Sequence, residues 1–223
     1  MGLIRPPIIQ VAIDVLKIDH ALRIAEAAAN AGADWLEAGT PLITFEGVGA
    51  IGAIAERFPE LPVLADFKAM DGVAKYVRET ANQGGRIATV CSVAADASIR
   101  AAVAAGREHG VAVVSDLYAA PDVPARARQI AALGVASVYV HYGADERNED
   151  PARDPLLYLP GTLKAVSVPV GVGTFSAEEG ARAFAMGAAI AAIGVPLINE
   201  PDPEAAFREY IARAREAYAA RSA

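Results

Sequence analysis

The sequence predicts an α/β fold, a single (β/α)8 barrel, from three observations. Short β-branched segments alternate along the chain with Ala-rich amphipathic segments. The β-branched segments are apolar at successive positions, as expected of parallel strands buried on both faces. The chain has 223 residues, and single eight-stranded barrels commonly have about this length. We therefore expect one domain over residues 1–223, with an open doubly wound sheet as the structural alternative.

Eight segments have the composition of buried strands. They are Ile8–Asp14, Trp35–Glu37, Val63–Phe67, Ile87–Ser92, Ala112–Leu117, Ser137–His141, Val168–Gly173 and Ala189–Gly194. The segments between and after them predict helices at His20–Ala31, Val48–Arg57, Gly72–Gln83, Ser98–Glu108, Pro124–Leu133, Ala177–Ala185 and Pro203–Ala219, with a weakly marked one near Leu157–Ala165. Glycines precede the strands in Ala31–Ala33, Leu133–Val135 and Met186–Ala188, where glycine typically ends a helix in left-handed geometry.

Charge and cysteine content exclude several classes of protein. The net charge is -7 and the basic residues do not cluster, so we expect no binding to nucleic acid or to anionic membranes. Cys91 is the only cysteine, which favours the reducing cytoplasm. Met1–Pro7 lacks the apolar region of a secretory signal. No uncharged apolar run reaches the roughly 18 residues of a membrane-spanning helix.

Polar residues stand where the predicted strands end. Asp14, Glu37, Asp66, Asp116 and His141 close five of them. Any one of these side chains could simply reach solvent, but the carboxyl ends of barrel strands converge on one axis, where the active sites of such barrels lie. A polar segment, residues 145–154, directly follows a strand and is expected to form a loop on the same face.

The segment Ala65–Asp71 is the most specific of these features. Asp66 and Lys68 are two residues apart in a strand and therefore point the same way. Asp71 stands where the next helix is predicted to begin. A lysine between carboxylates stays charged and can donate a proton. The alternative is a surface salt-bridge cluster with Asp71 capping the helix.

Several motifs in order resemble the orotidine-monophosphate decarboxylase superfamily, whose third strand carries Asp-x-Lys-x-x-Asp. The matching segments are Gln10–Asp14, Leu36–Ile43, Ala65–Asp71, Val90–Ser98 and Val138–His141. Within the superfamily they are most similar to the branch of 3-hexulose-6-phosphate synthases and 3-keto-L-gulonate-6-phosphate decarboxylases. The resemblance extends from about Ile8 to Asp145 and more faintly to the end of the chain.

The resemblance implies a role for each polar strand end. Glu37 and Asp66 would be ligands to Mg2+, which prefers oxygen, and the metal would bind a keto sugar as its enediolate forms. Lys68 would stabilise the same oxyanion, and Asp14 would orient Lys68 or a sugar hydroxyl. His141 would carry a proton, since the pKa of histidine lies near neutrality. The other two histidines, at predicted helix ends, are expected to be solvated.

The resemblance also implies a homodimer and a phosphate site. Asp71 would complete the active site of the neighbouring subunit. A substrate phosphate would be bound at the ends of the seventh and eighth strands, here by Gly173, Thr174, Gly194 and Val195.

The chain departs from the family pattern at this phosphate site. Val195 stands where glycine or arginine is expected. Pro196 has no N–H to donate, and Phe175 is positioned to fill the pocket. Phosphorylated substrates are therefore expected to bind weakly, unless Gly173, Gly194 and nearby hydroxyls suffice.

Two classes of function remain open on the sequence. The first is an enzyme, a carbon–carbon lyase resembling the synthases that join formaldehyde to a ribulose 5-phosphate-like enediolate. A decarboxylase of the sister or orotidine type is its alternative, although the decarboxylase branch usually carries an arginine shortly after its histidine and the nearest here is Arg147. The second class is a catalytically silent barrel acting as a binding protein. The intact strand-end residues favour the enzyme.

Overall fold

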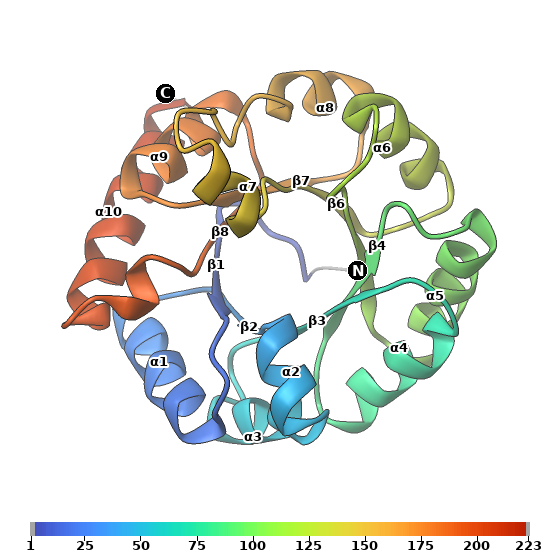
Figure 1. Ribbon diagram of the computed structural model, residues 1–223, viewed down its shortest axis with the longest axis horizontal. Coiled ribbons are helices and arrows are strands. Elements are labelled where there is room, and N and C mark those ends of the chain that lie inside the picture. Colours follow the sequence, from blue (N-terminus) through green and yellow to red (C-terminus); the bar gives the residue numbers. More distant parts are fainter. Residues whose placement is uncertain (1–2, 222–223) are drawn as a thin grey trace.

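Eight parallel strands close into a barrel in the computed structural model, which describes residues 3–221 (Figure 1). The strands are β1 (Ile8–Ile13), β2 (Trp35–Ala38), β3 (Val63–Ala69), β4 (Ile87–Cys91), β5 (Ala112–Asp116), β6 (Ser137–Val140), β7 (Val170–Thr174) and β8 (Ile190–Ile193). The last strand pairs in parallel with the first, so that Gln10 lies beside Ala192. This closure confirms the predicted (β/α)8 barrel and excludes the open sheet.

Helices surround the barrel (Figure 1). They are α1 (Ile18–Ala31), α2 (Thr40–Glu46), α3 (Gly49–Arg57), α4 (Val73–Asn82), α5 (Asp96–His109), α6 (Val123–Ala132), α7 (Ala144–Glu149), α8 (Leu159–Ala165), α9 (Ala177–Met186) and α10 (Pro203–Arg221), with a 3-10 turn η1 (Leu197–Asn199). Every predicted helix is confirmed to within about two residues at each end.

Two short helices were not predicted from the sequence. One is α2, which begins with Thr40 and Pro41 directly after Gly39, a composition typical of a loop. The other is α7, at the start of the polar segment that was expected to be a loop. No residue of α7 is buried, so no apolar periodicity marks it. The expectation of a loop was therefore wrong for the first part of that segment.

Three glycines end helices as predicted. Gly32, Gly134 and Gly187 have φ angles of 94°, 95° and 112°, a left-handed conformation that glycine adopts without steric cost. Each is followed within a few residues by a strand. These residues shape the return of the chain to the barrel and lie away from the strand ends that carry the polar groups.

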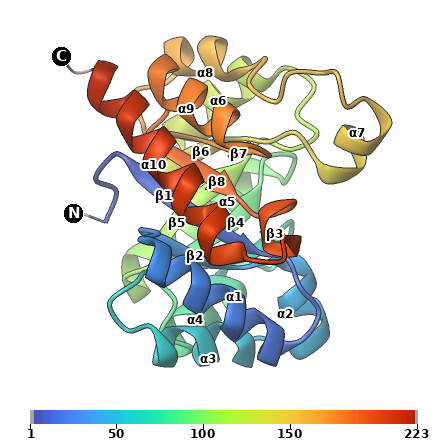
Figure 2. The same ribbon diagram turned by 90° about the vertical axis from the view of Figure 1, so that its left-hand side faces the viewer.

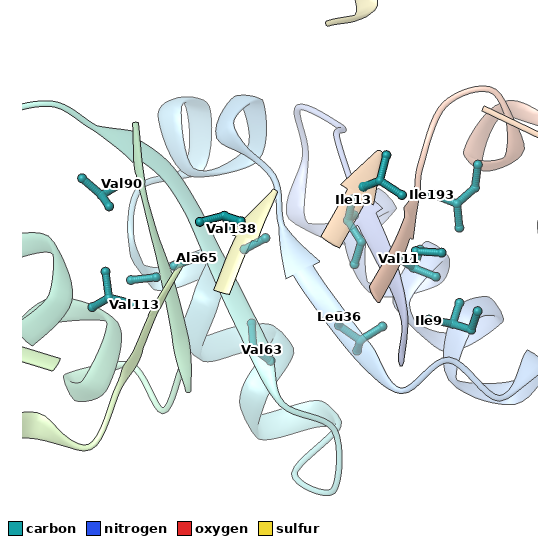
Figure 3. Packing of buried hydrophobic residues seen from close by; sticks show 14 of the residues in the cluster. Ile9, Val11, Ile13, Leu36, Val63, Ala65, Val90, Val113, Val138 and Ile193 are labelled. Atoms are coloured by element: carbon teal, nitrogen blue, oxygen red, sulfur yellow. The ribbon is translucent and has the colours of Figure 1, made fainter. Parts of the chain in front are cut away.

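Side chains along each strand alternate between the helix layer and the barrel interior. In β1, Ile9, Val11 and Ile13 belong to a large cluster shared with helix residues (Figure 3). Inward-facing Ile8 joins a second cluster with Leu64, made of residues in the strands or directly before one. That cluster also contains Trp35, Ile87, Val114, Tyr139, Ala189 and Ile190.

The inward positions change from apolar to polar toward the carboxyl ends of the strands. Trp35 is followed two residues later by Glu37, and Leu64 is likewise followed by Asp66. Because successive residues of a strand face opposite sides, residues two apart share a face. Strand alternation thus places a polar layer directly above the apolar layer inside the barrel.

Figure 2 shows α7 projecting from one end of the barrel and the amino-terminal segment at the opposite end. Helix α7 follows the carboxyl end of β6 directly, so it marks the end where the polar layer lies. None of the helices within residues 3–221 is long and apolar enough to cross a membrane.

Candidate active site

A cavity of about 440 Å³ opens at the carboxyl ends of the strands. Its volume is within the roughly 300–1,000 Å³ typical of small-molecule sites. The sequence-predicted residues that border it are Asp14, Glu37, Asp66, Lys68, His141, Gly173, Thr174, Gly194 and Val195. Asp71 does not border it and is exposed.

Lys68 occupies an irregular point of β3. The register between β3 and β4 shifts between Ala65 and Ala69, and Lys68 has a φ of 44°, a left-handed conformation that costs a non-glycine residue energy. Its backbone N–H donates to the Thr89 hydroxyl at 2.8 Å, which holds the distorted segment in place. Bulges of this kind re-aim a side chain beside an active site.

The Lys68 ammonium is surrounded by acceptors. It forms an ion pair with Asp66, lies 3.3 Å from the Thr40 hydroxyl and lies 3.7 Å from Asp116. Burial acts to lower the pKa of Lys68, but the negative charges of Asp66 and Asp116 outweigh it and raise the pKa above its usual value. Lys68 is therefore a fixed cation and a hydrogen-bond donor in the cavity at neutral pH.

Asp116 and His141 form a pair beside Lys68. The Nδ1 atom of His141 lies 2.8 Å from Asp116 Oδ2, and the Tyr118 N–H donates to the other carboxylate oxygen at 2.9 Å. Burial acts to lower the pKa of His141, but the charge and hydrogen bond of Asp116 raise it above its usual value. Asp116 is 5% exposed and does not simply reach solvent. The hydrogen bond to Asp116 uses Nδ1 of His141 and leaves Nε2 of the ring to exchange protons.

A buried chain of hydrogen bonds fixes Glu37. Tyr139 donates its hydroxyl hydrogen to Gln10 at 2.6 Å, and the Gln10 amide donates to Glu37 at 2.5 Å. Burial and the charge of Asp66 raise the pKa of Glu37 well above its usual value. Tyr139 fits because a Cβ at Gly171 would lie 2.7 Å from its ring. Neither Gln10 nor Tyr139 was singled out from the sequence.

The carboxylates suit a hard divalent cation. Glu37, Asp66 and Asp14 border the same cavity. The Asp14 residue is accessible to solvent, but many protein atoms surround its carboxylate. This partial desolvation and the charge of Asp66 raise the pKa of Asp14. Within residues 3–221 no group of three or more His, Cys, Asp or Glu side chains forms a metal cage. Mg2+ does not need one, since it often binds one or two protein carboxylates and keeps water or substrate oxygens as its other ligands.

Two threonine hydroxyls donate hydrogen bonds to the Asp66 carboxylate. One carboxylate oxygen accepts from the Thr40 hydroxyl at 2.7 Å and the other from the Thr89 hydroxyl at 2.8 Å. Both threonines border the cavity and were missed, because threonine is ordinary in a strand or at a helix start. Thr40 lies within a motif matched to the family, which is the one signal that could have found it. His20 and His109 lie on α1 and α5, away from the cavity.

The residues expected to bind phosphate differ in what they offer. Gly173 leaves open space beside its backbone. The hydroxyl of Thr174 donates to the Ala192 carbonyl at 2.9 Å and lies 2.7 Å from the Tyr210 hydroxyl on α10. Strand alternation turns the Thr174 side chain toward the helices, so its hydroxyl is engaged within the protein, although the residue borders the cavity. The side chain of Val195 is 40% exposed.

A closed eight-stranded barrel with a lysine, a histidine and several carboxylates gathered at the carboxyl ends of its strands defines a barrel enzyme. Two features support this class over a silent binding protein. Lys68 is held in a strained backbone conformation, and its ammonium lies between two carboxylates inside a ligand-sized cavity. Such strain and such charge clusters are typical of catalytic sites.

Comparisons with known proteins identify the family to which the chain belongs. Residues 7–210 match the Orotidine 5'-phosphate decarboxylase / HUMPS family. A 3-hexulose-6-phosphate synthase of Mycobacterium gastri is 35% identical over 206 residues, which cover 90% of this chain and 96% of that protein. The chain therefore belongs to this family, and it is an enzyme of the carbon–carbon lyase class.

Solved structures agree with this assignment. A crystal structure of a 3-hexulose-6-phosphate synthase has a TM-score of 0.87 at 34% identity and covers 92% of this chain and 98% of its own. A 3-keto-L-gulonate-6-phosphate decarboxylase from Vibrio cholerae has a TM-score of 0.81 at 22% identity and covers 96% and 98%. The second likeness shows the shared fold alone. The predicted resemblance to the superfamily is confirmed.

Proposed function

We propose that the chain is a Mg2+-dependent lyase that forms an enediolate from a keto sugar and joins it to formaldehyde, or runs the reverse cleavage. The observation that carries this proposal is Lys68, held between Asp66 and Asp116 with Glu37 bordering the same cavity. This arrangement offers a permanent positive charge beside carboxylates that could hold a metal ion. When bound, Mg2+ would supply Lewis acidity toward the substrate oxygens.

The chain's own residues provide the proton and charge steps. His141 takes a proton from the carbon next to the sugar carbonyl, and the electrons of that C–H bond form the enediolate. Lys68 donates a hydrogen bond to the oxygen on which the negative charge develops. The enediolate carbon then attacks the carbonyl carbon of formaldehyde, whose oxygen receives the proton back from His141. Asp14, at the mouth, would orient a sugar hydroxyl.

A deuterium-exchange screen tests this function. Keto sugars, with and without a phosphate group, are incubated in D2O with Mg2+ and no formaldehyde, and deuterium entering at the enediolate carbon is measured by NMR. We expect Mg2+-dependent exchange, and consumption of the sugar when formaldehyde is added. The absence of exchange with every sugar would rule out the proposal. Release of CO2 from a sugar β-keto acid without formaldehyde addition would favour a decarboxylase instead.

The decarboxylase alternative has less support from the site. The nearest arginine after His141 is Arg147, and its guanidinium is paired with Glu179 at 3.3 Å. Its charge is therefore already balanced by a residue of the same chain. The relatives of at least 30% identity described above are synthases by name. Both points favour aldol chemistry.

The His141→Asn substitution should slow deuterium exchange at the enediolate carbon by roughly a hundredfold, as expected for loss of a general base. Asn can keep a hydrogen bond to Asp116 but cannot carry the proton. We expect the Michaelis constant to change far less than kcat. His109→Asn is the matched control, because that residue lies on α5 outside the cavity. Unchanged exchange with a raised Michaelis constant would show that His141 only binds substrate.

The proposed partners are the keto sugar and a second copy of the chain. The proposed location is the cytoplasm, where the buried thiol of Cys91 would remain free. Exposed apolar side chains support a homodimer. They follow the carboxyl ends of the first four strands and are Leu16, Phe45, Met70, Tyr76 and Val93. Asp71 is exposed at this same end, with no side-chain hydrogen bond capping α4. These features are consistent with Asp71 completing a partner's site.

A further inference from the structure

The carboxyl ends of β7 and β8 form one side of the cavity, bordered by Gly173, Phe175, Gly194 and Val195. In many (β/α)8 barrels this region binds a substrate phosphate through backbone N–H groups and a helix N-terminus. A phosphate needs several donors that are free to point at it. In this chain one backbone donor of this region, the Phe175 N–H, is engaged by a side chain of the protein, and Pro196 has no N–H to offer.

The side chain of Glu179 occupies the first of these donor positions. Its Oε2 accepts the backbone N–H of Phe175 at 2.7 Å. The hydroxyl of Ser176 accepts the N–H of Glu179 at 3.2 Å and so caps the start of α9. Glu179 is 8% exposed. A buried carboxylate thus takes the hydrogen bond that a bound anion would require.

The basic side chain beside Glu179 is also paired within the protein. Arg147, on α7, lies 3.3 Å from the other side of the same carboxylate, Glu179 Oε1. Its guanidinium stacks over the Phe175 ring, 5.1 Å from the ring centre. Arg147 therefore closes α7 onto β7 through an ion pair and a cation–π contact. Little of its charge remains to attract a phosphate.

The β8 side offers an apolar surface. Val195 borders the cavity with its side chain 40% exposed, and Pro196 after it has no N–H. Gly194 has a packing reason to lack a side chain, because a Cβ there would lie 2.7 Å from the Ala12 carbonyl oxygen. The presence of this glycine is therefore no sign of an anion site.

The basic side chains that border the cavity lie away from its β7–β8 side. They are Lys68 of β3 and His141 at the end of β6. A dianion at the ends of β7 and β8 would therefore meet no basic side chain of the cavity lining, and an uncharged group does not need one.

We infer that the β7–β8 side of the cavity takes an uncharged end group of the keto sugar, such as a hydroxymethyl or methyl group, in place of a phosphate. The end group packs against Phe175 and Val195, and Glu179 is the specificity-determining residue that excludes the phosphate. This inference depends on the proposed function for the keto-sugar class. The named synthase relatives carry a hexulose 6-phosphate in their names, so the chain would differ from them at this end of the substrate.

A matched pair of probes tests the inference on the full-length, Mg2+-loaded enzyme. D-ribulose and D-ribulose 5-phosphate are compared by the deuterium-exchange assay, and kcat/KM is measured for each. One charge-assisted hydrogen bond to a phosphate raises affinity by roughly tenfold or more. We therefore expect the phosphorylated probe to be preferred by less than about tenfold. A larger preference for it overturns the inference.

Two substitutions that each remove one negative charge test whether Glu179 sets the preference between the two probes. Glu179→Gln frees Arg147 and should increase the relative kcat/KM of the phosphorylated probe by about tenfold or more. Glu178→Gln removes the same charge from an exposed neighbour in the same helical turn and should leave the ratio unchanged. An equal effect of both variants would show that general charge, and not the Glu179 contact, sets the preference, which contradicts the assignment.

Binding of inorganic phosphate separates failure of the inference from failure of the proposed function. If neither probe exchanges deuterium, the proposed function fails, and calorimetry with inorganic phosphate decides the inference alone. We expect no binding by the unmodified protein at millimolar concentrations. Millimolar or tighter binding, with an ordered phosphate on the Gly173 and Val195 backbones in a crystal, would refute it. This arm does not require any variant to fold.

Discussion

The Asp66→Asn substitution is expected to reduce Mg2+-dependent turnover on the order of a thousandfold while leaving the barrel folded. The carboxylate of Asp66 pairs with Lys68 and accepts from Thr40 and Thr89. Asparagine keeps the shape but loses the charge that a metal ligand requires. Its NH2 group would also face either Lys68 or a hydroxyl hydrogen. Both the proposed metal site and the position of Lys68 depend on this one charge.

Turnover, Mg2+ affinity by calorimetry and thermal unfolding measure the effect together. Asp19→Asn is the matched control, since Asp19 is an exposed residue of α1 away from the cavity. We expect this control to behave as the unmodified enzyme. Full activity of the Asp66→Asn enzyme, or of the unmodified enzyme in excess chelator, would show that Asp66 is not a metal ligand.

Mixing Asp71→Asn protein with Lys68→Ala protein should restore activity that neither has alone. In the proposed dimer each site combines Lys68 of one subunit with Asp71 of the other. A hybrid dimer would then contain one site with both residues intact and one site with neither. With equal amounts and free exchange, half of the dimers are hybrids, so about a quarter of the sites regain full function.

Activity is measured over time after mixing, and subunit exchange is followed by native mass spectrometry. The control mixes Lys68→Ala protein with a second preparation of itself and should stay inactive. Hybrid dimers that form without gaining activity would show that Asp71 serves its own subunit or none. An active monomer in sedimentation would contradict the shared site directly.

The positions of the strands and of their polar ends could be predicted because barrel geometry constrains them strongly. Buried parallel strands need apolar residues on both faces, and inward side chains at the carboxyl ends have one place to converge. Asp66 and Lys68 share a face for this reason. The left-handed backbone at Lys68 could not be predicted, since it depends on how β3 and β4 pair.

Side chains that act through tertiary contacts were also hidden from the sequence. Glu179 lies in the first turn of α9, where an acidic residue is ordinary because it favours the helix dipole. Its contact with the Phe175 N–H exists only once β7 and α9 meet. The outward direction of the Thr174 side chain could not be predicted for a related reason, since it follows from the strand register. In the inference drawn above, Glu179 is the residue that would distinguish this chain's substrate end from a phosphate site.

The hydrogen-bond chain from Tyr139 to Glu37 has an evolutionary consequence. The Tyr139 ring fills the space that a side chain at Gly171 would need, so these two positions on neighbouring strands cannot vary independently. A lineage that gained a side chain at position 171 would have to shrink residue 139, and with it would lose the hydroxyl bonded to Gln10. The alignment of Glu37 is thus inherited with a pair of linked residues, a glycine and a tyrosine, whose hydrogen-bond connection to Glu37 runs through Gln10.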